Sequence, residues 1–175
     1  MRLPHLAISA LSLAALSAFS NPETPLAASV GPARAAAAAM DHSAYDKILK
    51  KYVNESGRVN YKGLKADQQP LNQYLALLSK NPPAASWSKS EQMAYWINAY
   101  NAYTIRLVLD HYPISSIKDI GSKIKIPFVT TPWAIKFFSI GGEKMSLDKI
   151  EHGTLRKKYN DPRIHFSLVC ASWPF

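Results

Sequence analysis

The order of apolar and polar residues after position 40 predicts two short helices. Apolar side chains recur at three- and four-residue spacing over residues 45–53, and Ser43 with Asp46 has the spacing of a capping box. A second helix is predicted to begin at Pro70, which suits a first helical turn. The residues between them, 58–64, are predicted to be extended. The inward-facing residues of the second helix are expected to be Leu71, Tyr74, Leu75 and Leu78.

The strongest helical pattern lies between Ser88 and Pro113 and predicts a long central helix. Glu91 follows Ser88 by three residues, as in a capping box, and Pro113 sets the far limit. Apolar residues surround the axis, so we expect packing on nearly all sides. Asn98 and Asn101 share one face of this apolar cylinder. Because an unsatisfied buried amide costs about 1 to 3 kcal/mol, they are expected either to tie the helix to a distant backbone or to line a polar cleft.

The last third of the chain changes from helical to alternating patterns. Gly141 and Gly142 separate two short β-type runs and predict a two-residue hairpin. Ser146 is expected to cap a helix that ends near Pro162. Residues 163–171 alternate in polarity and predict a terminal strand, with Ile164, Phe166, Leu168 and Cys170 on one face and His165, Ser167 and Val169 on the other. The fold class is therefore α+β: a helical N-terminal half with a long buried central helix, then a hairpin, a helix and a terminal strand.

The first 40 residues have a different composition from the rest. Met1 and Arg2 precede an apolar run over residues 6–19, which has the length of a signal-peptide core and is shorter than the ~20 residues of a membrane span. Residues 1–20 are predicted to be a signal peptide and 21–40 an Ala- and Pro-rich linker. Residues 41–175 suffice for a single domain. We therefore expect export, to the periplasm or outside the cell, and no transmembrane segment in the mature chain.

The net positive charge of the chain limits the classes of binding partner that we expect. The net charge is +9, but the lysines are scattered and do not alternate with aromatic residues, so nucleic acid is not an expected partner. An exported basic protein would instead meet anionic components of the envelope. The sequence indicates no partner more specific than that.

Candidate chemistry is concentrated in residues 150–172. On a regular strand, His165 and Cys170 would lie on opposite faces and about 17 Å apart, so they would not form a dyad. A Cys170 nucleophile would need His152 as its base, with Glu151 or one of the two Asn residues to orient the imidazole. The alternative is that Cys170 is the last apolar residue of a core face. The candidate catalytic residues are Cys170, His152, His165 and Glu151.

The same segment offers groups that could bind a ligand. His152 and Arg156 are four residues apart and would share a helix face, which suits an anion or a carboxylate. The candidate ligand-binding residues are Asn98, Asn101, Arg156 and Arg163. A metal site is not expected, because Glu151 and His152 are adjacent and the chain has no HExxH motif. No cofactor is expected, because a glycine-rich phosphate loop is also missing from the sequence.

Two long motifs carry a family resemblance. YWINAYNAYTIRLVLDHYPISSIKDI and IGGEKMSLDKIEHGTLRKKYNDPRIHFSLVCAS resemble the family catalogued as domain of unknown function 547, over residues 45–172. The resemblance implies a fold, and it implies export because many bacterial members carry an export signal. In that family the segment equivalent to VCAS continues into a Gly-Cys-Pro element and further helices. Here residues 173–175 follow instead, so the domain is expected to be truncated and to lack the second cysteine.

Two classes of function are compatible with these residues. In the first, the protein is an envelope binding or accessory module whose polar cleft is formed by Asn98, Asn101, His152, Arg156, Arg163 and His165. In the second, it is a papain-like or transglutaminase-like thiol hydrolase or transferase with Cys170 as nucleophile, or an inactive relative in which His165 faces Asn101. The reactivity of Cys170 would distinguish the two classes.

Overall fold

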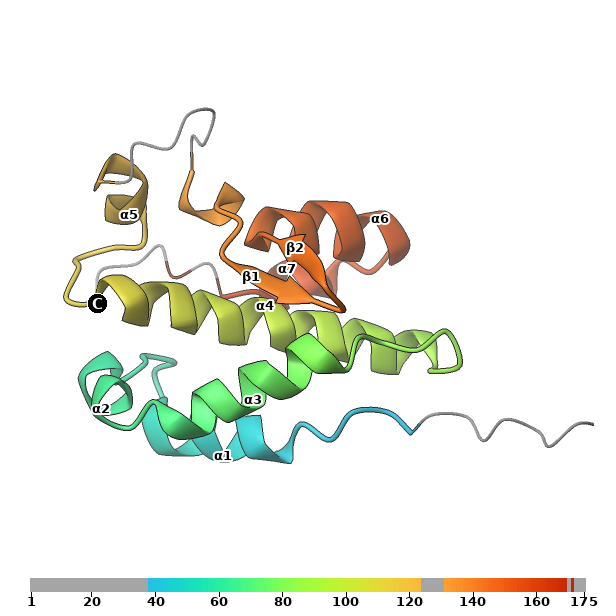
Figure 1. Cartoon of the computed structure of the whole chain (residues 1–175), viewed down its shortest axis with the longest axis horizontal. Coiled ribbons are helices and arrows are strands. Elements are labelled where there is room, and N and C mark those ends of the chain that lie inside the picture. The colour runs from blue at the N-terminus through green and yellow to red at the C-terminus, as the bar shows by residue number, and fades with distance from the viewer. Residues whose placement is uncertain (1–37, 124–130, 170, 172–175) are drawn as a thin grey trace, which may run out of the picture. The chain divides into compact units, whose positions relative to one another are not determined.

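The computed structural model describes residues 38–123, 131–169 and 171, which form an α+β fold (Figure 1). The helices before the hairpin are α1 (Ser43–Tyr52), α2 (Tyr61–Ala66), α3 (Gln69–Lys80), α4 (Lys89–His111), α5 (Lys118–Lys123) and the 3-10 turn η1 (Pro132–Ala134). The hairpin consists of β1 (Phe138–Ile140) and β2 (Glu143–Met145). After it come the π-helix η2 (Lys149–Leu155), α6 (Arg156–Lys158) and α7 (Arg163–Ser167). None of the described helices combines the length and apolar composition that a bilayer crossing requires.

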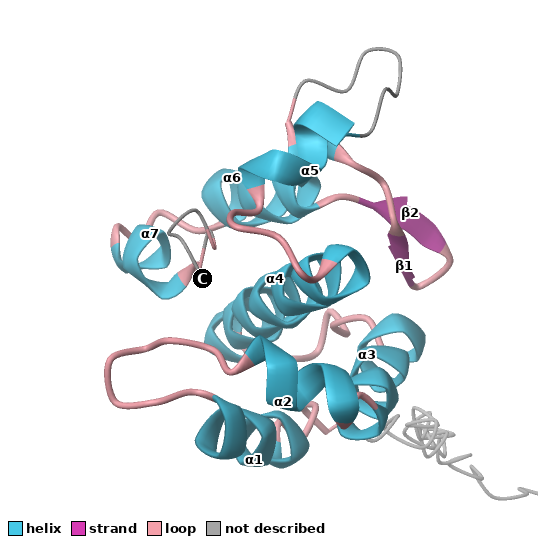
Figure 2. Cartoon of the chain, turned by 90° about the vertical axis from the view of Figure 1, so that its left-hand side faces the viewer, coloured by secondary structure: helices cyan, strands magenta, loops and turns pink. Residues whose placement is uncertain are grey.

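The long helix α4 lies between two layers, with α1 to α3 on one side and the hairpin, η2 and α6 on the other (Figures 1 and 2). Its predicted capping box is confirmed. The Oγ of Ser88 accepts from the Glu91 N–H at 3.2 Å, and the Glu91 carboxylate accepts from the Ser88 N–H at 2.7 Å. The helix ends at His111, shortly before Pro113, as predicted.

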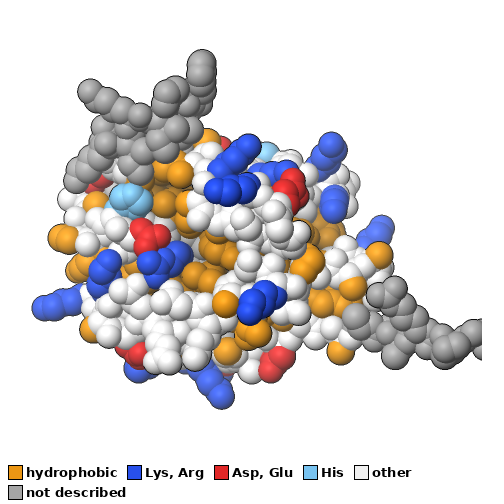
Figure 3. Space-filling model, viewed as in Figure 1, with side chains coloured by type: hydrophobic (Ala, Val, Ile, Leu, Met, Phe, Trp, Pro, Cys, Tyr) orange, Lys and Arg blue, Asp and Glu red, His pale blue; other side chains and the backbone are white. Residues whose placement is uncertain are grey.

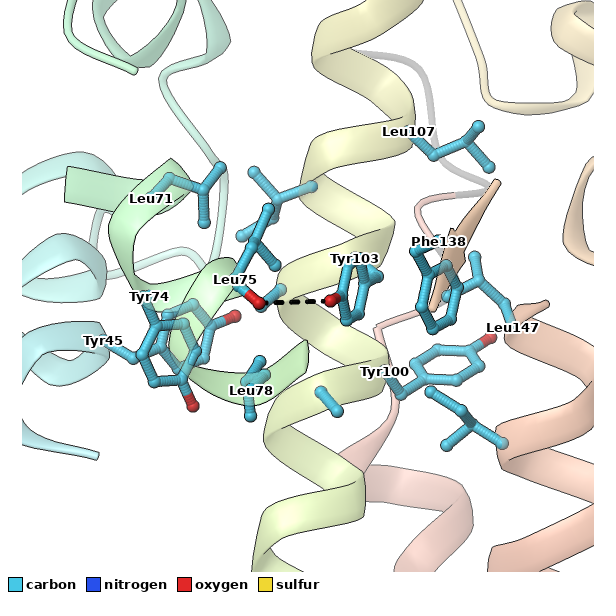
Figure 4. Packing of buried hydrophobic residues seen from close by; sticks show 14 of the residues in the cluster. Tyr45, Leu71, Tyr74, Leu75, Leu78, Tyr100, Tyr103, Leu107, Phe138 and Leu147 are labelled. Carbon is cyan, nitrogen blue, oxygen red and sulfur yellow. Dashed lines mark hydrogen bonds between the residues drawn. The ribbon is translucent and has the colours of Figure 1, made fainter. Parts of the chain in front are cut away.

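Tyrosines of α4 connect the two layers. The Tyr103 ring stacks on Phe138 of β1 with ring centroids 3.8 Å apart, while its hydroxyl donates to the Leu75 carbonyl of α3 at 3.2 Å (Figure 4). About two turns earlier in α4, the Tyr95 hydroxyl donates to the Leu78 carbonyl at 2.6 Å. Each tyrosine therefore buries its ring and still satisfies its polar end. The predicted stripe of α3, from Leu71 to Leu78, is buried as expected.

The hairpin prediction is confirmed by the backbone of its turn. Phe138 pairs with Met145 in an antiparallel ladder. Gly141 and Gly142 have φ values of 59° and 82°, the left-handed conformation that a two-residue turn of this kind demands of both residues. The Gly141 N–H donates to the Ser79 carbonyl at 2.8 Å, so the turn is also anchored to α3.

Two predictions for the helical half are corrected. The Ser43–Asp46 capping box does not form, because Asp41 accepts both the N–H and the hydroxyl of Ser43 at 2.8 Å and His42 is the N-cap residue. Residues 58–64 are not simply extended, because α2 begins within them. Asn60 caps α2 by accepting from the Gly63 N–H at 2.9 Å. Asn is a favoured N-cap residue, so Asn60 was the helix-start signal that the sequence prediction overlooked.

The predicted terminal strand over residues 163–171 is wrong, because residues 163–167 form α7. Asp161 accepts from the Arg163 N–H at 2.9 Å and Pro162 follows it, which together favour a helix start. Ile164 and Leu168, four apart, are buried, whereas Phe166 is 87% exposed. The predicted separation of His165 and Cys170 loses its basis with the strand, and Cys170 lies outside the described residues.

Candidate functional site

The π-helix η2 determines which charged residues meet. Its hydrogen bonds join residues five apart, and the Arg156 N–H donates to the Glu151 carbonyl. The side chains of the same two residues also pair, with Arg156 Nε and Nη2 donating to Glu151 Oε1 at 3.0 and 2.8 Å. The prediction that His152 and Arg156 share a helix face assumed an α-helical turn. The π turn instead brings the Glu151 carboxylate within hydrogen-bonding distance of the Arg156 guanidinium.

Arg156 also reaches α7. Its Nη2 lies 3.2 Å from Nδ1 of His165. Because a guanidinium has only donors, Nδ1 must be the acceptor and neutral His165 carries its proton on Nε2. The structure thus joins Glu151, Arg156 and His165 in one hydrogen-bonded chain, which we call the Arg156 triad.

The Arg156 triad presents donors to its surroundings. Of the five N–H groups of Arg156, Nε–H and both Nη2 hydrogens are used by Glu151 and His165. Within the described part of the chain, the two Nη1 hydrogens have no partner, and the Arg156 side chain is 42% exposed. The Glu151 side chain is only 14% exposed. The outward polar groups are therefore N–H donors, an arrangement that suits an anion.

His152 lies apart from the triad. It is exposed and makes no hydrogen bond within the described ranges. It interacts electrostatically with Asp148, four residues earlier. Burial raises the pKa of Asp148, while the positive charge of His152 acts in the opposite direction. Within the described residues, no hydrogen bond joins His152 to Arg156 or His165.

The Arg163 side chain is bound to Asp161 at the beginning of its own helix, α7. Its Nε and Nη2 donate to the two carboxylate oxygens of Asp161 at 3.0 and 2.7 Å, while the Arg163 backbone N–H binds the same carboxylate. These hydrogen bonds lower the pKa of Asp161 to about 2. Arg163 thus stabilises the beginning of α7, and Asp161 is a participant that the sequence analysis missed. The Asp-Pro dipeptide before residue 163 was the available signal.

The two predicted amides of α4 differ in role. Asn101 Nδ2 donates to the Ser167 carbonyl and its Oδ1 accepts from the Val169 N–H, both at 2.9 Å. Asn101 therefore ties α4 to the backbone that leads to Cys170. Asn98 is half-buried and makes no such bond within the described residues. The six residues expected to form a polar cleft thus do not converge: Arg156 meets His165, and the others have separate surroundings.

Two other features bear on possible ligands. A shallow cavity of about 360 Å³ lies at the connection between α1 and α2, lined by residues 51–54 and 58–60, and shares no residue with the Arg156 triad. Among the residues that the structure describes, no three His, Cys, Asp or Glu side chains gather closely enough to hold a metal ion. Figure 3 shows Lys and Arg side chains projecting from several parts of one face of the molecule.

Comparison with known proteins gives one match. No curated protein and no solved structure matches the chain. A family model matches residues 84–174, which begin just before α4, so the match starts later than the residue 45 expected from the motifs. It covers the whole of α4, the hairpin and the Arg156 triad. The chain therefore belongs to the family described as "Protein of unknown function, DUF547".

Proposed function

We propose that the protein is an exported binding or accessory module that holds an anionic group of the cell envelope on the Arg156 triad. The observation that carries the proposal is the shared guanidinium of Arg156. It is held on one side by Glu151 and His165, and its Nη1 hydrogens remain available at a partly exposed position. A carboxylate or phosphate ester would accept those hydrogens, and the hydrogen bonds would be charge-assisted.

The charge around the triad supports an anionic ligand. Lys157 and Lys158 follow Arg156 in α6, and both are exposed. The nearest carboxylate, Glu151, is largely shielded and already bound to the guanidinium. An approaching anion therefore meets a positive local field. The apolar run over residues 6–19 supports export, which would bring this surface to the envelope.

The hydrogen bonding of His165 favours binding over catalysis. A general base needs an unprotonated nitrogen directed at the proton that it removes. The Nδ1 lone pair of His165 is occupied by Arg156, and the other ring nitrogen carries the proton. His152, the alternative base, has no orienting hydrogen bond within the described part of the chain. Neither histidine is therefore prepared to activate a thiol in this arrangement.

The thiol hydrolase remains a second candidate because of Asn101. Its two hydrogen bonds hold the backbone at residues 167 and 169, immediately before Cys170. A firmly positioned backbone is what a nucleophile requires. The rate of iodoacetamide alkylation as a function of pH separates the candidates. The binding module predicts a thiol that reacts no faster than glutathione at pH 7, whereas rapid reaction at pH 6 would favour the enzyme.

Binding of glycerol phosphate to the full chain tests the proposal. Equilibrium dialysis should show binding by the unchanged protein, and R156Q should weaken it about tenfold or more, since hydrogen bonds to charged groups contribute about 1.5 to 3 kcal/mol. K47Q is the control. It removes the same charge from an exposed position on α1, outside the lining of the cavity. Equal binding by R156Q and K47Q, with circular dichroism showing both folded, would contradict the proposal.

A further inference from the structure

The residues beside the Arg156 triad include large apolar side chains that face outward. Phe166 of α7 is 87% exposed and Val169, three residues later, is 51% exposed. Their neighbours Ile164 and Leu168 are buried and hold α7 against the rest of the fold. The exposure of Phe166 is therefore not due to a detached helix. Figure 2 shows α7 at the margin of the described fold.

Phe166 is linked to Arg156 through His165. The rings of His165 and Phe166 lie with centroids 5.6 Å apart, and His165 in turn accepts from the Arg156 guanidinium at 3.2 Å. Lys157 and Lys158 follow Arg156 in α6, are exposed and have no carboxylate partner among the described residues. We call this set, Arg156, Lys157, Lys158, His165, Phe166 and Val169, the Phe166 surface. It combines cationic side chains with an exposed aromatic ring and an exposed aliphatic side chain.

We infer that the Phe166 surface docks on a bilayer that contains anionic lipids. The inference rests on the proposed function and names its partner, with lipid phosphates as the anions that the Arg156 triad accepts. Exposed aromatic and aliphatic side chains flanked by lysine and arginine are the composition of interfacial membrane anchors. The lysines and arginine attract the anionic surface, and Phe166 and Val169 enter the boundary between head groups and acyl chains.

Two other occupants fit the surface less well. An acidic polysaccharide would satisfy the cations but would offer no apolar phase for Phe166 and Val169. A second copy of the chain would bury the apolar side chains, but a twofold contact places the same surface on both partners. The cationic side chains of both copies would then be gathered in one interface, and the like charges would repel. Of these three occupants, the bilayer is the one that matches both the charge and the apolar side chains.

The test must be specific to this surface, because the apolar run over residues 6–19 could itself enter a bilayer. Two variants of the full chain, F166W and L77W, each add one tryptophan to the same four native ones. Leu77 lies on α3 and is 48% exposed, so it is a matched apolar control. Vesicles of phosphatidylglycerol and brominated phosphatidylcholine should quench the fluorescence of F166W clearly more than that of L77W. Vesicles of brominated phosphatidylcholine alone should quench the two variants equally.

Partitioning of further variants gives a second measurement. Since burying a phenylalanine contributes about 1.5 to 3 kcal/mol, F166S should lower partitioning into phosphatidylglycerol vesicles about tenfold or more. The double variant K157Q/K158Q should lower it about tenfold or more as well, since each lysine contributes about 1 kcal/mol. L77S should leave it unchanged. These residues are all exposed, so circular dichroism should show native helix content in every variant.

The outcomes separate this inference from the proposed function. Equal quenching of F166W and L77W in phosphatidylglycerol vesicles, or quenching of F166W that does not require the anionic lipid, would overturn the lipid inference. Binding of glycerol phosphate that is still sensitive to R156Q would then leave the proposed function intact. If R156Q has no effect on glycerol phosphate binding, the proposed function fails, and the lipid inference fails with it.

Discussion

At the scale of single residues, Asn101 shows how one side chain can replace a strand partner. Its amide donates to the Ser167 carbonyl and accepts from the Val169 N–H, which is the pattern of exchange between neighbouring strands. The sequence predicted that an amide in an apolar helix must be hydrogen-bonded. Helical periodicity assigns a residue to a face and does not say which segment packs there. The partner therefore could not be predicted.

Removing this amide should destabilise the fold measurably. N101A leaves the Ser167 carbonyl and the Val169 N–H without their partner, so the free energy of unfolding should fall by about 2 kcal/mol. N98A is the matched control on the same helix, because Asn98 makes no such bond within the described residues. Urea unfolding followed by circular dichroism gives both values. A loss for N98A as large as that for N101A would show that the hydrogen bonds are not the cause.

At the scale of elements, the π turn explains why the charged residues pair differently from the prediction. Ile150 and Leu155 are both buried, and their five-residue spacing fits the turn of η2. The shared face expected for His152 and Arg156 assumed the α-helical spacing. The spacing of two apolar residues is too little to distinguish five-residue from four-residue hydrogen bonding in advance. The pairing of Glu151 with Arg156 was therefore missed.

Glu151 should compete with the ligand for the guanidinium. E151Q keeps the side-chain shape and removes the negative charge beside Arg156, so affinity for glycerol phosphate should rise several-fold, in line with the roughly 1 kcal/mol of an ion pair near the surface. The stability of the fold should change by less than about 1 kcal/mol. Equilibrium dialysis and urea unfolding measure the two effects. Weaker binding by E151Q would mean that Glu151 assists the ligand, contrary to the proposed arrangement.

The elements that were predicted well have signals at both ends. Helix α4 has a capping box at Ser88 and a proline after its end, and its bounds match the prediction. Helix α7 spans five residues, too few to separate alternation from helical spacing. Ile164 and Leu168 satisfy a period of two and a spacing of four equally well. For such short elements, the local hydrogen bonds of Asp161 decide the outcome.

At the scale of the whole described fold, α4 carries the packing of both layers. The prediction that it is packed on nearly all sides agrees with its buried residues, which include Tyr95, Tyr100, Tyr103 and Leu107. A further aromatic group lies in the layer of α1 and α3, where Tyr74 stacks on Tyr45 with centroids 4.8 Å apart. His42 Nδ1 lies 2.7 Å from the Tyr74 hydroxyl at the edge of this group. A half-buried histidine, His42, thus lies at the edge of the core, immediately before α1.

His42 should make the stability of the fold depend on pH. Burial lowers the pKa of His42 below its ordinary value of 6.5, with Asp41 opposing the shift. Below pH 6.5 the unfolded chain therefore binds more protons at this residue than the folded chain does. Stability should fall as the pH falls through 6.5 toward the lowered pKa. At neutral pH and above, protonation of His42 should not lower the free energy of unfolding.

The H42N variant isolates this contribution. Asn can keep a hydrogen bond to Tyr74 and does not titrate. The loss of thermal stability between pH 7.5 and pH 5 should therefore be smaller in H42N than in the unchanged protein. H152N is the control, because His152 is exposed. If both variants lose as much stability as the unchanged protein, another group is responsible for the acid sensitivity.

The hydrogen bonds of Asn101 also separate the course of the chain from its surface chemistry. They involve only main-chain atoms of Ser167 and Val169, so they form with almost any side chain at those two positions. Proline at 169 is the exception, because it has no N–H to donate. The path of the backbone at residues 167–169 is thus set by Asn101, which lies on a helix distant in the sequence. Val169 can be exchanged to retune what the exposed segment binds, without redirecting the backbone that presents it.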